Sequence, residues 1–141
     1  MSELIFDASD CIAGRLASLV AKEILKGNRV SIVNAEKAVI LGNPEAIEQT
    51  WREKVERGHP YQGPFYPKQP ERILRRIIRG MVPRKKPRGR EALKRLRIFI
   101  GVPEGYEERE KIRPEKVVKK PHHKFIYLGE LSLKLGGKKR W

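Results

Sequence analysis

The stretch LIFDASDCIAGRLASLVAKEILKGNRVSIVNA, residues 4–35, changes its hydrophobic period twice. Residues 4–8 form a short apolar run that predicts a strand, and Ser9 or Asp10 is placed to cap a following helix. From Gly14 the apolar residues share one helical stripe, namely Leu16, Leu19, Val20 and Ile24. Gly27 is a suitable helix end, and the β-branched run 29–35 predicts a buried strand. Two strands joined by a helix within about thirty residues indicate a βαβ unit with a parallel strand pair.

The sequence between residues 38 and 81 continues this alternation of strands and helices. Residues 38–42 predict a further buried strand, and Asn43 followed by Pro44 predicts the start of a helix. Its expected buried face consists of Ile47, Trp51 and Val55. The Pro- and Gly-rich segment 57–70 predicts a loop. The spacing then predicts a helix over 70–81, with an apolar stripe of Ile73, Leu74, Ile77, Ile78 and Met81.

The remaining segments complete an α/β pattern. Residues 97–103 predict another strand, residues 104–124 an irregular hydrated segment, and the last residues a short strand or helix with a basic tail. Three or four short strands alternating with amphipathic helices indicate a layered α/β domain with a mostly parallel sheet. A length of 141 residues fits a single domain, 1–141.

The charge distribution is strongly uneven along this chain. The formal net charge is +15, but residues 1–71 hold 9 basic and 10 acidic groups. Residues 72–97 hold 12 basic groups and 1 acidic group, and residues 111–141 hold 10 and 2. Such asymmetry indicates a polyanionic partner, most often nucleic acid. The alternative interpretations are a basic surface that only increases solubility and a disordered basic arm.

The central basic block is placed between predicted sheet elements, so a folded platform holds it. The outward side of the helix 70–81 and the segment GMVPRKKPRGREALKRL, residues 80–96, together supply eleven candidate RNA-binding residues, which are Arg72, Arg75, Arg76, Arg79, Arg84, Lys85, Lys86, Arg88, Arg90, Lys94 and Arg95. Nine of the 12 basic groups in 72–97 are Arg, whose planar fork binds phosphate oxygens in pairs. No base-reading DNA motif is present, which favours recognition of RNA shape.

Several classes of protein are disfavoured. The N-terminal residues lack the basic and apolar regions of a signal peptide, and no apolar run reaches the ~18 residues of a membrane span. A single cysteine, Cys11, fits a reducing, cytoplasmic setting. We find no nucleophile–base set, nucleotide loop or cofactor motif, so we expect neither an enzyme nor a cofactor.

Three segments together carry a resemblance to a known family: DASDCIAGRLASLVAKEIL, VSIVNAEKAVILGNP and RGMVPRKKPRGREALKRLRIFIGVP. In order and spacing they resemble the L-thirteen family of large-subunit ribosomal proteins, over nearly the whole chain. The short N-terminus and the ending PHHKFIYLGELSLKLG look like the archaeal and eukaryotic branch, and the archaeal type is favoured.

The resemblance implies a three-layer α/β/α fold with a four-stranded, mainly parallel sheet. It implies a structural, non-catalytic component of the large ribosomal subunit in the cytoplasm, which binds ribosomal RNA, adjoins other ribosomal proteins and supports assembly. The RNA contacts it implies are Arg79, Arg84, Lys85, Lys86, Arg88 and Arg90. Two alternatives stay open: a translational regulator acting off the ribosome, and an RNA-modifying enzyme.

Four further features carry weaker predictions. Adjacent His122 and His123 point apart on an extended chain, so we expect RNA contact or exposure and no metal site. Cys11 is expected to be an inert, partly buried thiol, and the turn 42–44 to cap a helix. The aromatic residues Tyr61, Phe65 and Tyr66 either stack on bases or cover the edge of the core. Trp141 either anchors the tail on RNA or contacts a neighbouring protein.

Overall fold

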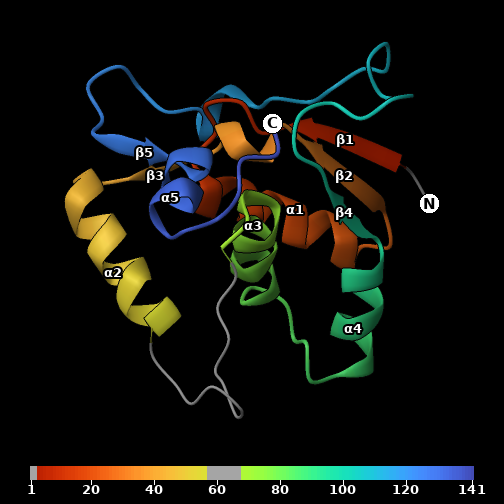
Figure 1. Cartoon of the computed structure of the whole chain (residues 1–141). Helices are drawn as coiled ribbons and strands as arrows, with labels where there is room; N and C mark the ends of the chain where they lie inside the picture. Colours follow the sequence, from red (N-terminus) through yellow and green to blue (C-terminus); the bar gives the residue numbers. More distant parts are fainter. Residues whose placement is uncertain (1–2, 57–67) are drawn as a thin grey trace.

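The computed structural model describes residues 3–56 and 68–141, and Figure 1 shows the arrangement of their elements. The order along the chain is β1 (Glu3–Asp7), α1 (Ala13–Leu25), β2 (Arg29–Val33), η1 (Ala35–Lys37), β3 (Val39–Leu41), α2 (Pro44–Glu56), α3 (Pro70–Arg79), α4 (Pro87–Lys94), β4 (Leu96–Ile98), η2 (Glu115–Val117), β5 (Phe125–Tyr127) and α5 (Leu128–Lys134). No helix among these described residues is long and apolar enough to cross a membrane. The aromatic residues Tyr61, Phe65 and Tyr66 lie outside the described residues.

The predicted βαβ unit is confirmed. Strands β1, β2 and β4 form a parallel sheet in that order, with Leu4 paired to Val30 and Val30 paired to Leu96. Both crossovers step in the same direction across the sheet, so right-handed connections place α1, α3 and α4 on one face. Figure 1 shows these three helices on the same side of the strands. Gly27 has φ +102, the left-handed conformation that lets the chain leave α1 and enter β2.

The expectation of one four-stranded sheet is wrong. Strand β3 pairs antiparallel with β5, Ile40 opposite Ile126, in a separate two-stranded sheet. A single parallel bridge, between Ile12 and Val39, connects β3 to the segment after β1. The strand 38–42 was therefore identified, but its hydrogen-bond partner comes from the C-terminal part of the chain. Helices α2 and α5 pack beside this second sheet.

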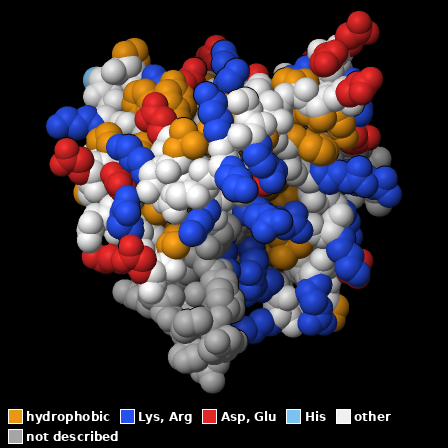
Figure 2. Space-filling view, viewed as in Figure 1, with side chains coloured by type: hydrophobic (Ala, Val, Ile, Leu, Met, Phe, Trp, Pro, Cys, Tyr) orange, Lys and Arg blue, Asp and Glu red, His pale blue; other side chains and the backbone are white. Residues whose placement is uncertain are grey.

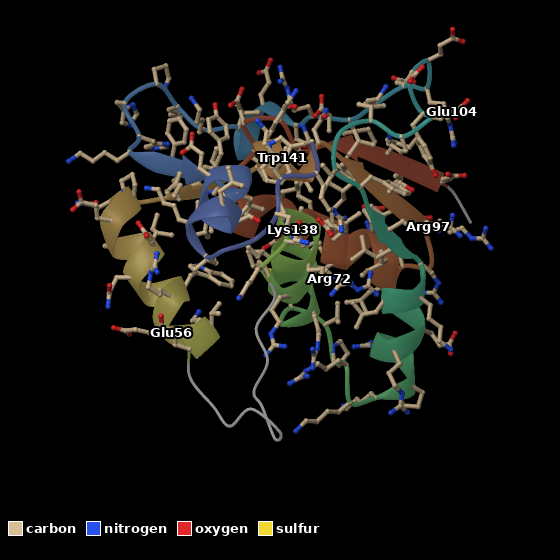
Figure 3. All side chains as sticks on the ribbon, in the orientation of Figure 1. Glu56, Arg72, Arg97, Glu104, Lys138 and Trp141 are labelled. Atoms are coloured by element: carbon tan, nitrogen blue, oxygen red, sulfur yellow. The ribbon has the colours of Figure 1, made fainter. Side chains whose placement is uncertain are left out.

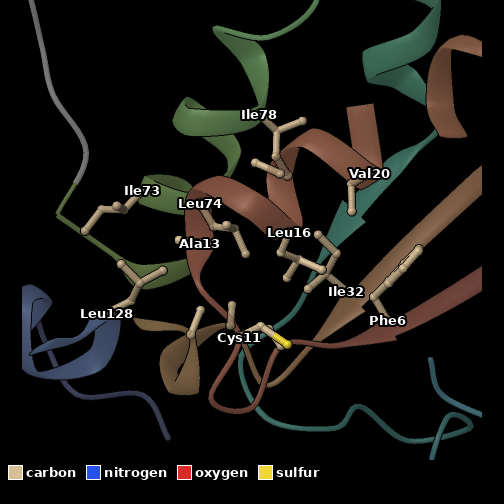
Figure 4. Close-up of a cluster of buried hydrophobic side chains, with 14 of the residues drawn as sticks. Phe6, Cys11, Ala13, Leu16, Val20, Ile32, Ile73, Leu74, Ile78 and Leu128 are labelled. Atoms are coloured by element: carbon tan, nitrogen blue, oxygen red, sulfur yellow. The ribbon is translucent and has the colours of Figure 1, made fainter. Parts of the chain in front are cut away.

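The core is built from the apolar stripe of α1 and the buried residues of the strands and α3. Leu16, Val20 and Ile24 of α1 are fully buried and pack with Phe6 and Ile32 of the sheet, as Figure 4 shows in part. Small alanines beside the stripe let α1 lie close to the strands. The expected side-chain cap by Ser9 or Asp10 is wrong, since Ile12 precedes the helix and caps it only with its backbone.

Helix α3 begins at Pro70 as predicted but ends at Arg79, because Gly80 follows as its last capping residue. Ile73, Leu74 and Ile78 are fully buried, whereas Met81 is 42% exposed. The prediction that Met81 continues the stripe is wrong, since the helical period stops before it. The apolar side of α3 packs on α1, and its arginine side is left at the surface.

This orientation of α3 predicts unequal costs for two neighbouring substitutions. Ile78→Ala is expected to lower the free energy of unfolding by about 2–5 kcal/mol, because its side chain is fully enclosed. Ile77→Ala is expected to cost only about 1–2 kcal/mol, because Ile77 lies at the margin of the core. Urea unfolding of both variants measures the difference, and equal losses would mean that the helix is rotated from this orientation.

The segment after β4 carries an acidic loop that projects from the molecule. Residues 104–110 include Glu104, Glu107, Glu108 and Glu110, and all four are exposed. Figure 3 shows Glu104 on this projecting loop, away from Arg72, and Figure 2 shows acidic side chains gathered at the same corner. The acidic loop is therefore separated from the arginines of α3.

Candidate nucleic-acid interface

The four arginines of α3 line one shallow hollow. Arg72 and Arg75 are exposed and Arg76 and Arg79 are partly buried, and together they surround a volume of about 210 Å³. Their spacing of three and four residues places them on one side of a helix whose other side is fixed in the core. The structure thus brings these four predicted residues together.

The turn after α3 continues this cationic surface. Val82 is buried and anchors the turn, in which the Arg84 N–H donates to the Val82 oxygen and the Lys86 N–H donates to the Pro83 oxygen, at 2.8 and 2.9 Å. The side chains of the following predicted residues are all exposed: Arg84, Lys85, Lys86, Arg88 and Arg90. None of these five forms an ion pair with a carboxylate in the described part of the chain. We call the eleven predicted residues from Arg72 to Arg95 the arginine array.

Two members of the arginine array have a structural role that the sequence did not reveal. The Arg75 guanidinium donates to the backbone oxygens of Leu93 and Leu96, at 3.1 and 3.2 Å. The Arg95 guanidinium donates to the backbone oxygen of Ile24 at 2.7 Å. These contacts join the end of α4 to α3 and α1. An arginine has five N–H donors, so both residues retain N–H groups that these backbone contacts do not use.

The remaining member, Lys94, forms an exposed ion pair with Glu91 at 3.4 Å. An exposed pair of this kind contributes about 0–1 kcal/mol to stability, so a phosphate can replace the carboxylate at little cost. Figure 2 shows how Lys and Arg side chains gather over the part of this face where α3 and α4 lie.

A hollow of about 550 Å³ beside α4 adds residues that the sequence interpretation missed. Lys94 and Arg95 line it together with Arg29, Arg97 and Tyr106. Two carboxylates, from Glu3 and Glu91, also line it. Arg97 lies within the basic block, and the parallel register that pairs Ser31 with Arg97 brings Arg29 to the same end of the sheet. Predicting that Arg29 and Arg97 lie at the same end of the sheet would have required the β1–β2–β4 strand order, which the sequence did not reveal.

The histidine pair does not have the geometry expected of it. Residues 121–122 form a turn, so the two rings are in edge contact with centroids 4.5 Å apart instead of pointing to opposite sides. Nδ1 of His123 accepts a hydrogen bond from the backbone N–H of Lys120 at 3.2 Å. Within the described ranges, no group of three or more His, Cys, Asp or Glu residues is arranged to hold a metal ion.

Two other minor predictions are tested by the structure. The N–H of Glu45 donates to the Asn43 side chain at 2.9 Å, which confirms that the turn 42–44 caps α2. The tail folds back on the chain itself: the Trp141 ring lies against Gly129, and Arg140 pairs with Glu71 at 3.0 Å. Figure 3 shows Trp141 and Lys138 on this returning segment. The sequence interpretation considered RNA and a neighbouring protein as partners of Trp141, but not a helix of the same chain.

Cys11 is fully buried, and its Sγ donates to the backbone oxygen of Asp7. Burial, with Asp7 nearby, raises the pKa of the thiol to about 11. At pH 8 the thiolate is therefore roughly one part in a thousand. We expect native protein to react with a neutral thiol reagent far more slowly than unfolded protein does. Labelling with and without urea measures this, and equal rates would contradict the buried placement.

The fold and the arginine array define a small α/β protein with a cationic surface suited to polyanion binding. The family model described as ribosomal protein L13 matches residues 2–105. The chain is 49% identical to a protein of Methanopyrus kandleri over 94% of this chain and 86% of that one. It is 44% identical to a protein of Haloarcula marismortui, over 99% and 95%. Both are named large ribosomal subunit protein uL13. The chain therefore belongs to the ribosomal protein L13 family.

Proposed function

We propose that this chain is a structural component of the large ribosomal subunit, in the cytoplasmic ribosome, that binds ribosomal RNA through the arginine array. The observation that carries the proposal is the row of cations on α3, the turn 80–86 and α4, which a folded core holds at the surface. Five of them form no ion pair with a described carboxylate, namely Arg84, Lys85, Lys86, Arg88 and Arg90. The names of the archaeal relatives support the ribosomal setting. Neighbouring ribosomal proteins are the expected further partners.

The chemistry of the arginine array suits a phosphate backbone. The guanidinium group binds two phosphate oxygens at once and is less strongly hydrated than an ammonium group, so burial against RNA costs less. Pro83 and Pro87 restrict the turn between α3 and α4, which lowers the conformational entropy lost on binding. If about eight side chains neutralise phosphates, the slope of log affinity against log salt is roughly −6 to −7.

A role in assembly is supported by the way in which buried Val82 and backbone hydrogen bonds hold this surface in place. Ribosomal RNA helices repel one another through their phosphates, and a preformed cationic surface reduces that repulsion without a folding cost. We propose a structural role in this process and no catalysis. A protein that only positions RNA needs charge and shape at the surface, which the arginine array supplies.

Sedimentation of a cell extract tests the proposal. After a moderate salt wash, the protein is expected to migrate with large subunits, because many phosphate contacts act together. In molar salt it is expected to dissociate, because counterion release no longer favours binding. A pool that is mainly free before the wash would instead favour a regulator or a modifying enzyme.

A further inference from the structure

One edge of the parallel sheet is open along part of its length. Strand β1 lies at the outer edge of this sheet (Figure 1), and the segment after the acidic loop bridges to it at a single residue, Ile112. The Ile112 N–H donates to the Ile5 oxygen at 2.7 Å, and the Ile112 oxygen accepts from the Asp7 N–H at 2.9 Å. Toward the start of β1, at Glu3 and Leu4, no described residue continues this pairing. An open edge of this kind can accept a further strand from another chain.

A hollow of about 320 Å³ lies beside the open part of β1. It is lined by Glu3, Leu4, Ile5, Arg109, Glu110 and Ile112. Three of these residues are aliphatic, and Ile112 is 37% exposed, one of only four large hydrophobic side chains that are exposed among the described residues. The other three are charged. An apolar centre with a charged rim is the usual composition of a protein interface.

The acidic loop that borders this hollow is held by its own aromatic and basic side chains. The Tyr106 ring packs on Phe99, with the ring centroids 5.4 Å apart, and the Arg109 guanidinium lies 5.3 Å from the Tyr106 centroid. Arg109 also pairs with Glu3 at 3.2 Å. The Lys111 ammonium donates to two backbone oxygens of the loop, at 3.0 and 3.1 Å. The two cations of this segment are therefore already engaged with groups other than the glutamates of the loop.

The four glutamates of the acidic loop consequently have no cationic partner in the part of the chain that the structure describes. All four are exposed, and none of them forms an ion pair there. On a chain with a net charge of +15, they make a local negative surface next to an apolar hollow. Such a surface repels phosphate groups and attracts a cationic segment of a protein.

The occupant of this hollow has to come from outside the chain. The chain's own basic tail lies elsewhere, because the Trp141 ring packs against Gly129 and Arg140 pairs with Glu71 on α3. A second copy of this chain would present its basic block on the helices α3 and α4 and the folded turn between them, not on an extended strand. A basic, extended segment of another protein fits both the charge of the acidic loop and the open backbone of β1.

We infer that a basic, extended segment of another protein binds in this hollow and adds to the sheet along the start of β1. Its backbone pairs with the open part of β1, its cationic side chains face the acidic loop, and an aliphatic side chain covers Ile112. The inference rests on the proposed function for the expectation of a protein partner, and it specifies where and by which contacts that partner binds. The hollow shares no residue with the arginine array, so the partner and RNA do not compete.

A peptide titration tests this binding on the isolated, full-length chain. The probe is a short synthetic peptide of alternating Lys and Val, which forms a strand with cationic and aliphatic sides. Amide NMR shifts are expected to change at residues 3–5 and 104–112. A peptide of alternating Lys and Pro has the same charge but fewer N–H groups, so it is expected to bind about tenfold more weakly. Equal binding of the two peptides, no binding of the first, or shifts only elsewhere would overturn the inference.

A matched pair of variants separates the acidic loop from negative charge in general. Glu108→Gln with Glu110→Gln removes two charges of the loop, and Glu53→Gln with Glu56→Gln removes two exposed charges of α2. The first pair is expected to bind the Lys–Val peptide about fivefold more weakly, since two exposed charge contacts are lost. The control pair is expected to bind the peptide as the unmodified protein does, and equal weakening of both would overturn the inference. Neither pair touches the arginine array, so RNA binding of both is expected to be unchanged.

Site-specific crosslinking tests whether the hollow is occupied in the assembled particle. A photoreactive amino acid replaces Glu108, which is exposed. Crosslinks are expected to a protein segment rich in Lys and Arg, which mass spectrometry of the crosslinked peptide identifies. Crosslinks to RNA only, to a second copy of this chain, or to nothing would overturn the inference. Failure of the unmodified protein to enter large subunits would instead contradict the proposed function.

Discussion

Replacing Arg84, Lys85, Lys86 and Arg88 together by alanine is expected to weaken binding to large-subunit ribosomal RNA several-hundred-fold, with little change in the melting temperature. Each lost phosphate contact removes about 0.7–0.9 of a decade in affinity per decade of salt. The contribution of the phosphate contacts vanishes near 1 M salt, and physiological salt lies about 0.8 of a decade below that concentration. At physiological salt, four contacts therefore contribute roughly 2.5 decades of affinity. Affinity measured against salt concentration should also show a slope that is less steep by roughly 3.

The stability of this variant follows from where the four side chains lie. All four are exposed, and none pairs with a described carboxylate, so their removal takes away no packing and relieves mutual repulsion. A triple variant, Arg52→Ala with Lys54→Ala and Lys134→Ala, is the control for lost charge on another face. The control is expected to bind RNA nearly normally. If both variants lose the same affinity per charge, binding depends on net charge alone and the arginine array has no special role.

The sequence predicted individual helices and strands better than it predicted which strands pair with each other. The period change over residues 4–35 identified β1, α1 and β2, and the parallel pairing followed because the crossover contains a helix. Strand β3 carries the same kind of apolar run, but its partner β5 lies more than eighty residues further along the chain. No local pattern distinguishes a strand that joins the parallel sheet from one that pairs elsewhere.

In the candidate site, the sequence likewise identified the basic residues but not the contacts that they make. An arginine that faces solvent and one that donates to a distant backbone oxygen have identical sequence signals, which is why the anchoring contacts of Arg75 and Arg95 were not foreseen. The basic block itself was visible, because Lys and Arg outnumber acidic residues so strongly there. Arg29 was missed for the opposite reason, since it stands in a near-neutral part of the sequence.

Position 89 requires glycine, because the turn between α3 and α4 packs closely against it. It is buried in the first turn of α4, and a Cβ built there would lie 2.0 Å from the Pro83 oxygen and 2.9 Å from the Arg84 nitrogen. Both are backbone atoms of the turn that presents the arginine array. A side chain at position 89 therefore cannot be accommodated by a rotamer change, and the turn and α4 must move apart.

Gly89→Ala is accordingly expected to lower the free energy of unfolding by about 3 kcal/mol or more, at the upper end of overpacking effects, and to weaken RNA binding in the same variant. Gly80→Ala is the matched control, since its Cβ would meet no atom closer than 3.5 Å and its backbone is already right-handed. That control is expected to be unchanged or more stable by about 0.4–1 kcal/mol. Urea unfolding and RNA titration of both variants measure these effects. A Gly89→Ala protein as stable as the control would show that α4 does not pack on the turn as closely as this structure requires.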